Sequence, residues 1–126
     1  MSLSVIIPTV QVGALLTRCL RALAEQTCLP AEVIVIIAHP DSPSVEEGEW
    51  PWPLRVVRCS SQAHSGAAVN RGFALAEATG LVILNDDTRP RPGFLAALQA
   101  AWSRHGLALY QPVSYTHLRA HETTDN

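Results

Sequence analysis

The chain contains no lysine, and all nine of its basic residues are arginines. Eleven acidic residues outnumber them, so the net charge is −2, and charged residues make up only 16% of the sequence. Proteins that bind nucleic acid or anionic membrane surfaces usually carry a basic excess. The composition therefore argues against nucleic acid as a partner.

Long apolar runs and a cysteine framework are also missing. No apolar segment approaches the roughly 20 residues of a membrane-spanning helix, so we expect no membrane span. Cys19, Cys28 and Cys59 form no CxxC pair and follow no secretory signal, which favours free thiols over a metal or redox role. No targeting peptide is visible, so we expect a cytoplasmic protein, or one at the cytoplasmic face of the membrane when full-length.

What the chain does contain is an alternation of short apolar segments with amphipathic ones. Its 126 residues, 48% of them apolar, suffice for one domain with a sizeable core. Strands are predicted at 3–8, 32–37, 54–59 and 81–84, with another beginning at 107–111. Helices are predicted at 14–26, 67–78 and 94–105, and prolines keep 39–53 irregular. This alternation predicts an α/β fold with a mainly parallel sheet and helices on both faces.

Local signals refine these elements. The first helix has an apolar stripe that includes Leu15, Cys19 and Leu23. The third strand alternates apolar and charged residues, so we expect it near a sheet edge. Gly80 is expected to end the second helix, and Pro92 suits the first turn of the third.

The segment LVILNDDT at 81–88 takes an apolar strand directly into Asn85, Asp86 and Asp87. Ligands of parallel α/β sheets bind at the carboxyl ends of the strands, where these residues are expected. Neighbouring carboxylates repel each other, and a divalent cation that also contacts a diphosphate would neutralise them. Solvated loop aspartates are the simpler alternative, and the pair alone does not decide between the two.

The last fourteen residues, VSYTHLRAHETTDN, have no apolar period. His117 and His121 have a spacing that would suit a metal on a helix, but VSYTHLRAHET resembles the translation of a transposase-type sequencing adapter. We therefore interpret 113–126 as a non-native read-through tail that does not pack on the core. The reading frame is then cut near residue 112, and 1–112 is part of a longer domain.

Four segments, SVIIPT, AEQT, EVIVI and AAVNRGFALAEATGLVILNDDTRPRPGFLAAL, together resemble the family 2 glycosyltransferases of the GT-A fold. The resemblance covers residues 3–111 and implies a Rossmann-like GT-A domain whose N-terminal half is 1–112. This half would hold a nucleotide-diphosphate sugar, with Mn or Mg, for transfer to an acceptor that is a saccharide, lipid or protein. The implied metal ligands are Asp87 and, assisting it, Asp86. The implied nucleotide-sugar contacts are Pro8, Thr9, Asn70, Arg71, Asn85 and Asp86.

The chain departs from the family pattern in three respects. Asn85 stands where the family has aspartate, and Ala38-His39-Pro40 replaces an acidic turn, although Asp41 follows. The catalytic base and the acceptor-binding half would lie beyond residue 112, so we expect donor binding without transfer by this chain.

The sequence allows one main alternative function and excludes another. A non-catalytic nucleotide-binding module, or pseudoenzyme, of the same fold is the main alternative. A haloacid-dehalogenase phosphatase is excluded, because its DxDxT element lies on the first strand and its aspartates are not adjacent. Trp50 and Trp52 could stack on a sugar ring, but burial of their faces is the interpretation we favour.

Overall fold

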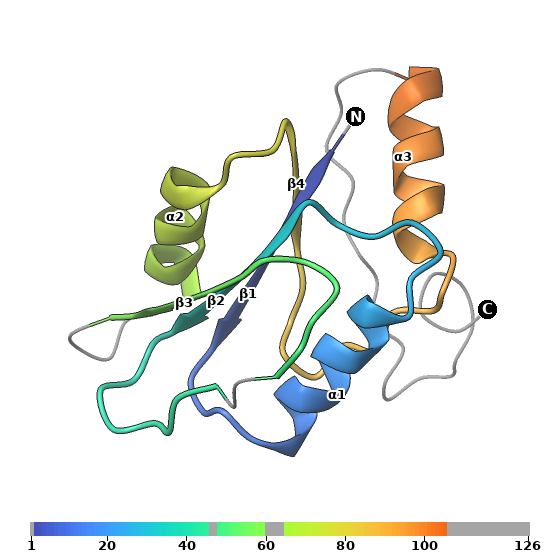
Figure 1. Ribbon diagram of the computed structural model, residues 1–126. Coiled ribbons are helices and arrows are strands. Elements are labelled where there is room, and N and C mark those ends of the chain that lie inside the picture. Colours follow the sequence, from blue (N-terminus) through green and yellow to red (C-terminus); the bar gives the residue numbers. More distant parts are fainter. Residues whose placement is uncertain (1, 46–47, 60–64, 106–126) are drawn as a thin grey trace.

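The computed structural model describes residues 2–45, 48–59 and 65–105 (Figure 1). These residues form elements in the order β1–α1–β2–β3–α2–β4–α3. The strands are β1 (Leu3–Thr9), β2 (Glu32–Ile37), β3 (Leu54–Arg58) and β4 (Gly80–Ile83). The helices are α1 (Ala14–Ala24), α2 (Ser65–Leu75) and α3 (Phe94–His105). The predicted strand at 107–111 and the predicted tail at 113–126 lie outside the described residues.

The four strands form a parallel sheet in the order β3-β2-β1-β4. The chain starts at an inner strand, continues outward through β2 to β3, and then crosses to the other side of β1 with β4. The order therefore reverses beside β1, which is where α/β sheets bind ligands. The predicted parallel α/β fold is confirmed, and β3 lies at an edge as its alternating sequence indicated.

Alternate residues of the strands face different helices. In β1, Val5 and Ile7 belong to the core cluster that includes the apolar faces of α1 and α3. Ile6, between them, belongs to the cluster beneath α2. Figure 1 shows α2 on one side of the sheet and α1 and α3 on the other. Every residue of β2 is buried, as expected for a central strand covered on both faces.

Several boundaries differ from those predicted. The buried stripe of α1 centres on Leu16, Cys19 and Leu20, and Leu15 is 52% exposed. Helix α2 ends at Leu75, and Gly80 begins β4 instead of ending the helix. Space explains the glycine: a β-carbon at Gly80 would stand 2.4 Å from a ring atom of Trp102. Helix α3 has the predicted bounds, Phe94–His105, but Pro92 lies two residues before it and not in its first turn, a difference within the usual uncertainty of helix ends.

The cysteines are free thiols, as the sequence indicated. Cys19 is buried, whereas Cys28 and Cys59 are only partly buried. None of the described helices is long and apolar enough to cross a membrane.

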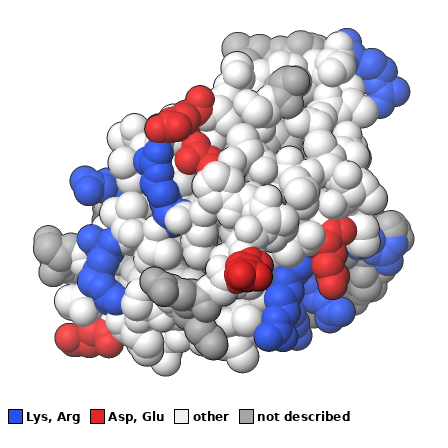
Figure 2. All heavy atoms as spheres, in the orientation of Figure 1, with Lys and Arg blue, Asp and Glu red and all other residues white. Residues whose placement is uncertain are grey.

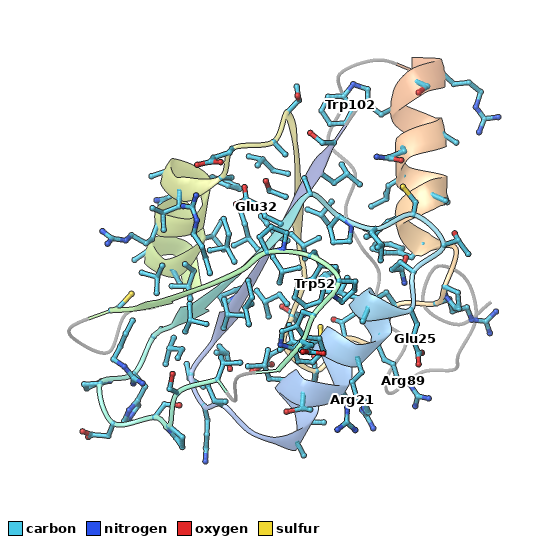
Figure 3. All side chains as sticks on the ribbon, in the orientation of Figure 1. Arg21, Glu25, Glu32, Trp52, Arg89 and Trp102 are labelled. Carbon is cyan, nitrogen blue, oxygen red and sulfur yellow. The ribbon has the colours of Figure 1, made fainter. Side chains whose placement is uncertain are left out.

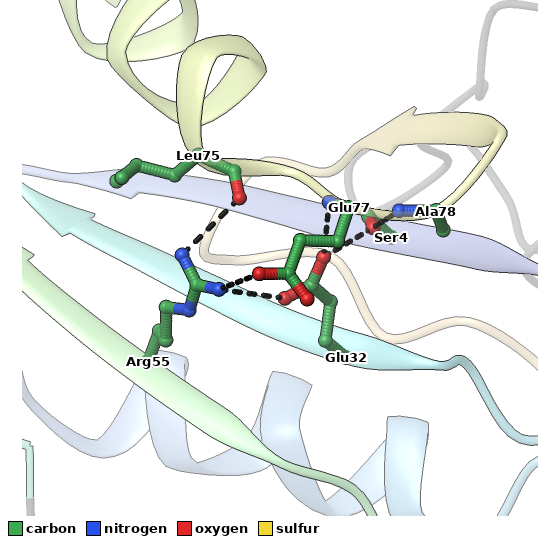
Figure 4. A network of polar contacts seen from close by, with 6 residues as sticks. All are labelled: Ser4, Glu32, Arg55, Leu75, Glu77 and Ala78. Carbon is green, nitrogen blue, oxygen red and sulfur yellow. Dashed lines mark hydrogen bonds and ion pairs between the residues drawn. The ribbon is translucent and has the colours of Figure 1, made fainter.

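A polar network joins the end of α2 to the amino-terminal edge of the sheet (Figure 4). The carboxylate of Glu32, on β2, accepts hydrogen bonds of 2.7 Å from the Ser4 hydroxyl and from the N–H of Glu77. Arg55, on β3, donates 3.1 Å to the carbonyl of Leu75 and pairs with Glu77 at 2.8 Å. The network therefore holds the chain segment that leads from α2 into β4.

Glu32 should make the stability of the chain depend on acid. Burial raises the pKa of its carboxyl group, but the bonds from Ser4 and the Glu77 N–H, together with Arg55, outweigh burial and leave the pKa below its ordinary value. The contribution is then present above the unfolded pKa of about 4.3 and is lost as pH falls through the lower folded pKa.

We expect Glu32→Gln to lower the free energy of unfolding at pH 7 by about 1–3 kcal/mol, because a neutral amide oxygen makes weaker bonds to Ser4 and to the Glu77 N–H than the charged carboxylate does. Urea denaturation at pH 7 and below pH 4 measures this, and the difference between variant and parent should shrink in acid. Glu77→Gln is the matched control, since its side chain is 75% exposed and such pairs contribute about 0–1 kcal/mol. Equal losses from both variants, unchanged by pH, would contradict the assignment.

Candidate functional site

The site is built at the carboxyl edge of the sheet, where β1 and β4 end side by side. The Leu84 N–H donates to the Ile6 carbonyl at 3.0 Å, which extends the β1–β4 pairing beyond the end of β4. The chain then turns at once, because the Thr88 N–H donates 3.1 Å to the Asn85 carbonyl. This tight turn presents Asp86 between the ends of the two strands.

Thr9 and Asp86 connect the two strands directly. The Thr9 hydroxyl lies 2.6 Å from Asp86 Oδ2 and 3.0 Å from the Gln11 carbonyl, and it accepts from the Gln11 N–H at 3.3 Å. A hydroxyl has one proton to donate, and the short contact to a charged acceptor is the stronger of its two choices. Thr9 therefore orients one carboxylate oxygen of Asp86 and leaves the other for a ligand.

A cavity of about 280 Å³ opens over this pair. Its lining combines apolar and polar residues from four parts of the chain: Pro8, Thr9, Val10, Ala38, Ala68, Asn85, Asp86 and Asp87. Its size is near the lower end of small-molecule pockets, which measure about 300–1,000 Å³. Apolar side chains and carboxylates in one lining suit a ligand that has an apolar part and that binds together with a cation.

The structure brings five of the seven residues predicted from the sequence into this one cavity. Asn70 and Arg71 are the exceptions, since both are exposed on α2 and neither lines the cavity. The α2 residue that does line it is Ala68, which is fully buried. Alanine has no functional group that would mark it in a sequence, and the roles of Asn70 and Arg71 stay predictions.

The two carboxylates produce a negative electrostatic environment in the site. Burial, followed by the charges of Asp86 and Asp87, raises the pKa of the Cys19 thiol to about 12. This thiol lies 3.9 Å from the Asn85 carbonyl, on the α1 side of the turn. Cys19 is thus protonated at neutral pH, and the site favours a cation.

The residues present fit a divalent cation of a particular kind. The described residues include no group of three or more His, Cys, Asp or Glu side chains that could hold a metal. Mg²⁺ and similar ions, however, often bind one or two carboxylates and complete their coordination with substrate phosphates and water. Asp87 and the free oxygen of Asp86 supply such a partial set.

Sequence reasoning assigned no role to Gln26, which positions the loop after the turn. Its side chain is 5% exposed. The amide nitrogen donates to the Arg91 carbonyl at 2.6 Å, and the amide oxygen accepts from the Leu95 N–H at 2.9 Å. Gln26 therefore connects the end of α1 to the first turn of α3 and holds the loop before α3 at Pro90 and Arg91.

The surface carries no large patch of one charge on the face seen in Figure 2. Basic and acidic side chains alternate over that face. This agrees with the small net charge.

Comparison with known proteins points to one family. A family model described as Glycosyl transferase family 2 matches residues 4–123. The match extends past residue 112, so the predicted boundary at that residue stays a prediction. No curated protein sequence matches the chain significantly.

Solved structures with the same fold include those of S. aureus TarS. The full TarS structure has a TM-score of 0.68 and 22% identity, and the match covers 83% of this chain and 20% of that one. TarS 1–349 has a TM-score of 0.69 and 20% identity, covering 88% of this chain and 39% of that one. TarS 1–349 with UDP-GlcNAc has a TM-score of 0.68 and 20% identity, with coverages of 88% and 37%. The chain thus spans well under half the length of these structures.

Proposed function

We propose that this chain, which belongs to glycosyl transferase family 2, binds a nucleotide-diphosphate sugar in the cavity between the ends of β1 and β4. The observation that supports this most is the 2.6 Å contact between Thr9 and Asp86. It joins the two strands at the point where strand order reverses, with Asp87 adjacent. The crystallised TarS complexes with UDP and UDP-GlcNAc indicate the same class of donor.

The apolar residues and the carboxylates of the cavity lining suit the two parts of such a donor, the nucleoside and the diphosphate. Pro8, Val10, Ala38 and Ala68 form the apolar part of the lining and would contact the nucleoside. The diphosphate would lie toward Asp86 and Asp87, the residues that would hold a Mn or Mg ion, and the ion would neutralise the charge of the diphosphate. Asn85, an exposed amide, would donate to or accept from a ribose hydroxyl where the family has a carboxylate.

Each site residue then has a defined task. Thr9 fixes the rotamer of Asp86, and Asp87 supplies the second charge. When bound, the ion would stabilise the negative charge of the departing diphosphate as a Lewis acid. Transfer also needs a base for the acceptor hydroxyl, and none of the carboxylates that line the cavity is free for it. We therefore propose that this chain holds the donor and does not transfer the sugar alone.

Calorimetry with UDP tests donor binding. We expect UDP to bind more tightly with Mn²⁺ than without it, and Asp87→Ala to weaken the Mn²⁺-dependent binding at least tenfold. Loss of a charge-assisted contact costs roughly 1.5–3 kcal/mol, and 1.4 kcal/mol corresponds to a factor of ten. Asp41→Ala is the control, because Asp41 is exposed and does not line the cavity. If the affinity for UDP were the same with and without Mn²⁺, and the same in Asp87→Ala and the parent, the two carboxylates would be solvated loop residues without a role in binding.

A non-catalytic nucleotide-binding module of the same fold is the second candidate. The turn after β2 favours it, since His39 and Pro40 carry no negative charge and the His39 Nδ1 is engaged by the Asp41 N–H at 3.0 Å. A transfer assay on the longer protein that contains this chain separates the two. Transfer of sugar from a UDP-sugar supports the enzyme, and tight UDP binding without transfer supports the module.

A further inference from the structure

A second group of cavities is lined by the loop between β2 and β3, where this loop passes α1. Trp52 is 4% exposed, and its Nε1 donates to the Leu23 carbonyl at 3.4 Å. Trp50 stacks on Trp52 with ring centroids 5.2 Å apart and an interplanar angle of 5°. Figure 3 places Trp52 beside α1 and far from Trp102. The buried indole therefore holds the half-buried one in a fixed orientation.

Trp50 borders two cavities at once. One, of about 210 Å³, lies toward α1 and includes Thr17 and Arg21 in its lining. The other, of about 480 Å³, includes Trp52 and Leu54. Gly48, Glu49 and Trp50 line both. Neither cavity shares a residue with the one at Thr9 and Asp86, so this is a separate place on the molecule.

The polar atom of Trp50 has no partner. Its Nε1 is buried and makes no hydrogen bond. No other buried side-chain nitrogen or oxygen atom of the described residues lacks a hydrogen bond. A buried N–H without an acceptor is costly. A β-carbon at Gly48 would stand 3.5 Å from this Nε1, so the glycine lies beside the N–H edge of the ring.

We propose that Trp50, Glu49 and Arg21 form a second site that binds an uncharged saccharide unit of the acceptor, away from the hydroxyl group that receives the sugar. This rests on the proposed function, which requires such a partner. A pyranose with equatorial hydroxyl groups has apolar C–H faces that pack against an indole. Its hydroxyls would donate to the Glu49 carboxylate and accept from the Arg21 guanidinium.

The charges select against other small ligands. Glu49 borders both cavities and would repel a phosphate or carboxylate placed against the indole. Arg21 lines the smaller cavity and disfavours a cation there in the same way. A neutral ligand that carries both donors and acceptors satisfies the two charges together. The larger cavity lies within the range of about 300–1,000 Å³ for small-molecule sites, which is room enough for a sugar ring.

The indole N–H signals in a nitrogen-15 correlation spectrum give a direct test, with cellobiose as the probe. Trp50, Trp52 and Trp102 are the tryptophans of the chain, so each site has its own reporter. We expect cellobiose to shift the Trp50 signal with a Kd on the order of 1–10 mM, typical of a contact worth only about 3–4 kcal/mol. The Trp102 signal, from α3, should stay in place.

Two variants make the test specific. Glu49→Gln alters an exposed side chain and should weaken cellobiose binding severalfold while the rest of the spectrum stays unchanged. Gly48→Ala places a methyl group beside the Trp50 N–H and should weaken binding as well. Absence of any Trp50 shift at saturating cellobiose, or an equal shift of Trp102, would overturn the proposal and leave the stacked indoles with a packing role only.

UDP distinguishes failure of this site from failure of the proposed function. In the same samples, UDP with Mg²⁺ should bind without displacing cellobiose, because the two cavities share no residue. If UDP binds and cellobiose does not shift Trp50, the saccharide site is wrong and donor binding stands. If cellobiose shifts Trp50 and UDP does not bind, the saccharide site stands and the proposed function fails.

Discussion

Gly72→Ala should destabilise the chain, although an alanine inside a helix normally stabilises it. On helix propensity alone the substitution would be favourable by about 1 kcal/mol. In this fold, however, a β-carbon at position 72 would lie 2.4 Å from Cγ2 of Ile6. Ile6 is completely buried and is paired with Ile34 and Ile83 on the neighbouring strands. We expect a loss of about 1–3 kcal/mol or more in the free energy of unfolding, as for other overpacked cores.

Denaturant titration measures this loss, and two further variants show where it comes from. Gly93→Ala is the matched control, because a β-carbon there meets nothing within 4 Å; we expect a change within about 0.5 kcal/mol. Ile6→Ala should be destabilising alone, yet its combination with Gly72→Ala should cost less than the sum, since the new methyl group enters the space that Ile6 leaves. Additive losses in this double-mutant cycle would show that Gly72 does not set the distance between α2 and β1.

Gly72 also shows what can be read from a sequence about this fold. The alternation of apolar segments with amphipathic ones sufficed to predict a parallel α/β sheet, because strand and helix periods are local properties. The predicted helix at 94–105 has the observed bounds. The role of a glycine is harder to predict from sequence, since glycine occurs at helix ends, in turns and at sites of close packing. The sequence predicts Gly80 at a helix end, but Gly80 begins β4, where a β-carbon would collide with Trp102 of α3 and Leu3 of β1.

The position of the candidate site was predictable, whereas its detailed lining was not. Carboxyl ends of parallel strands share one edge, so the residues after β1 and β4 could be expected near each other. That Thr9 contacts Asp86 depends on β1 and β4 being neighbours, and strand order is not written in any local pattern. Ala38 and Ala68 contribute only shape, for which no chemical signature exists.

The contacts of Gln26 show the same limit at longer range. The residue lies in the AEQT segment that resembles the family, yet its partners at positions 90, 91 and 95 are 64 to 69 residues away. A sequence shows a glutamine at the end of a helix, where an exposed side chain is the usual expectation. The fold instead buries this amide and uses it to connect two helices through the loop that carries the carboxylates.

Gln26→Leu should therefore impair both stability and nucleotide binding. Leucine fills a similar volume but leaves the Leu95 N–H without its bond of 2.9 Å. The Arg91 carbonyl loses the 2.6 Å bond from Gln26 but still accepts from the Phe94 N–H at 3.0 Å. A buried group left unpaired costs about 1–3 kcal/mol, so we expect a loss of about 1–3 kcal/mol, a substantial part of a typical stability of 5–15 kcal/mol. Calorimetry at a temperature where the variant remains folded should show UDP binding with Mn²⁺ weakened severalfold, because residues 85–93 lose their support.

Thr27→Val separates this effect from a general weakening of the same region. The Thr27 hydroxyl donates to the Pro92 carbonyl at 3.2 Å, but that carbonyl also accepts from the Thr27 N–H at 2.8 Å and would stay paired. We expect a loss of at most about 0.5 kcal/mol and unchanged UDP affinity. If Gln26→Leu lowered stability but left UDP affinity equal to that of Thr27→Val, Gln26 would support only the fold. A loss of affinity in the folded Gln26→Leu variant alone would show that this buried amide also positions Asp86 and Asp87, because it acts on them only through the loop they share.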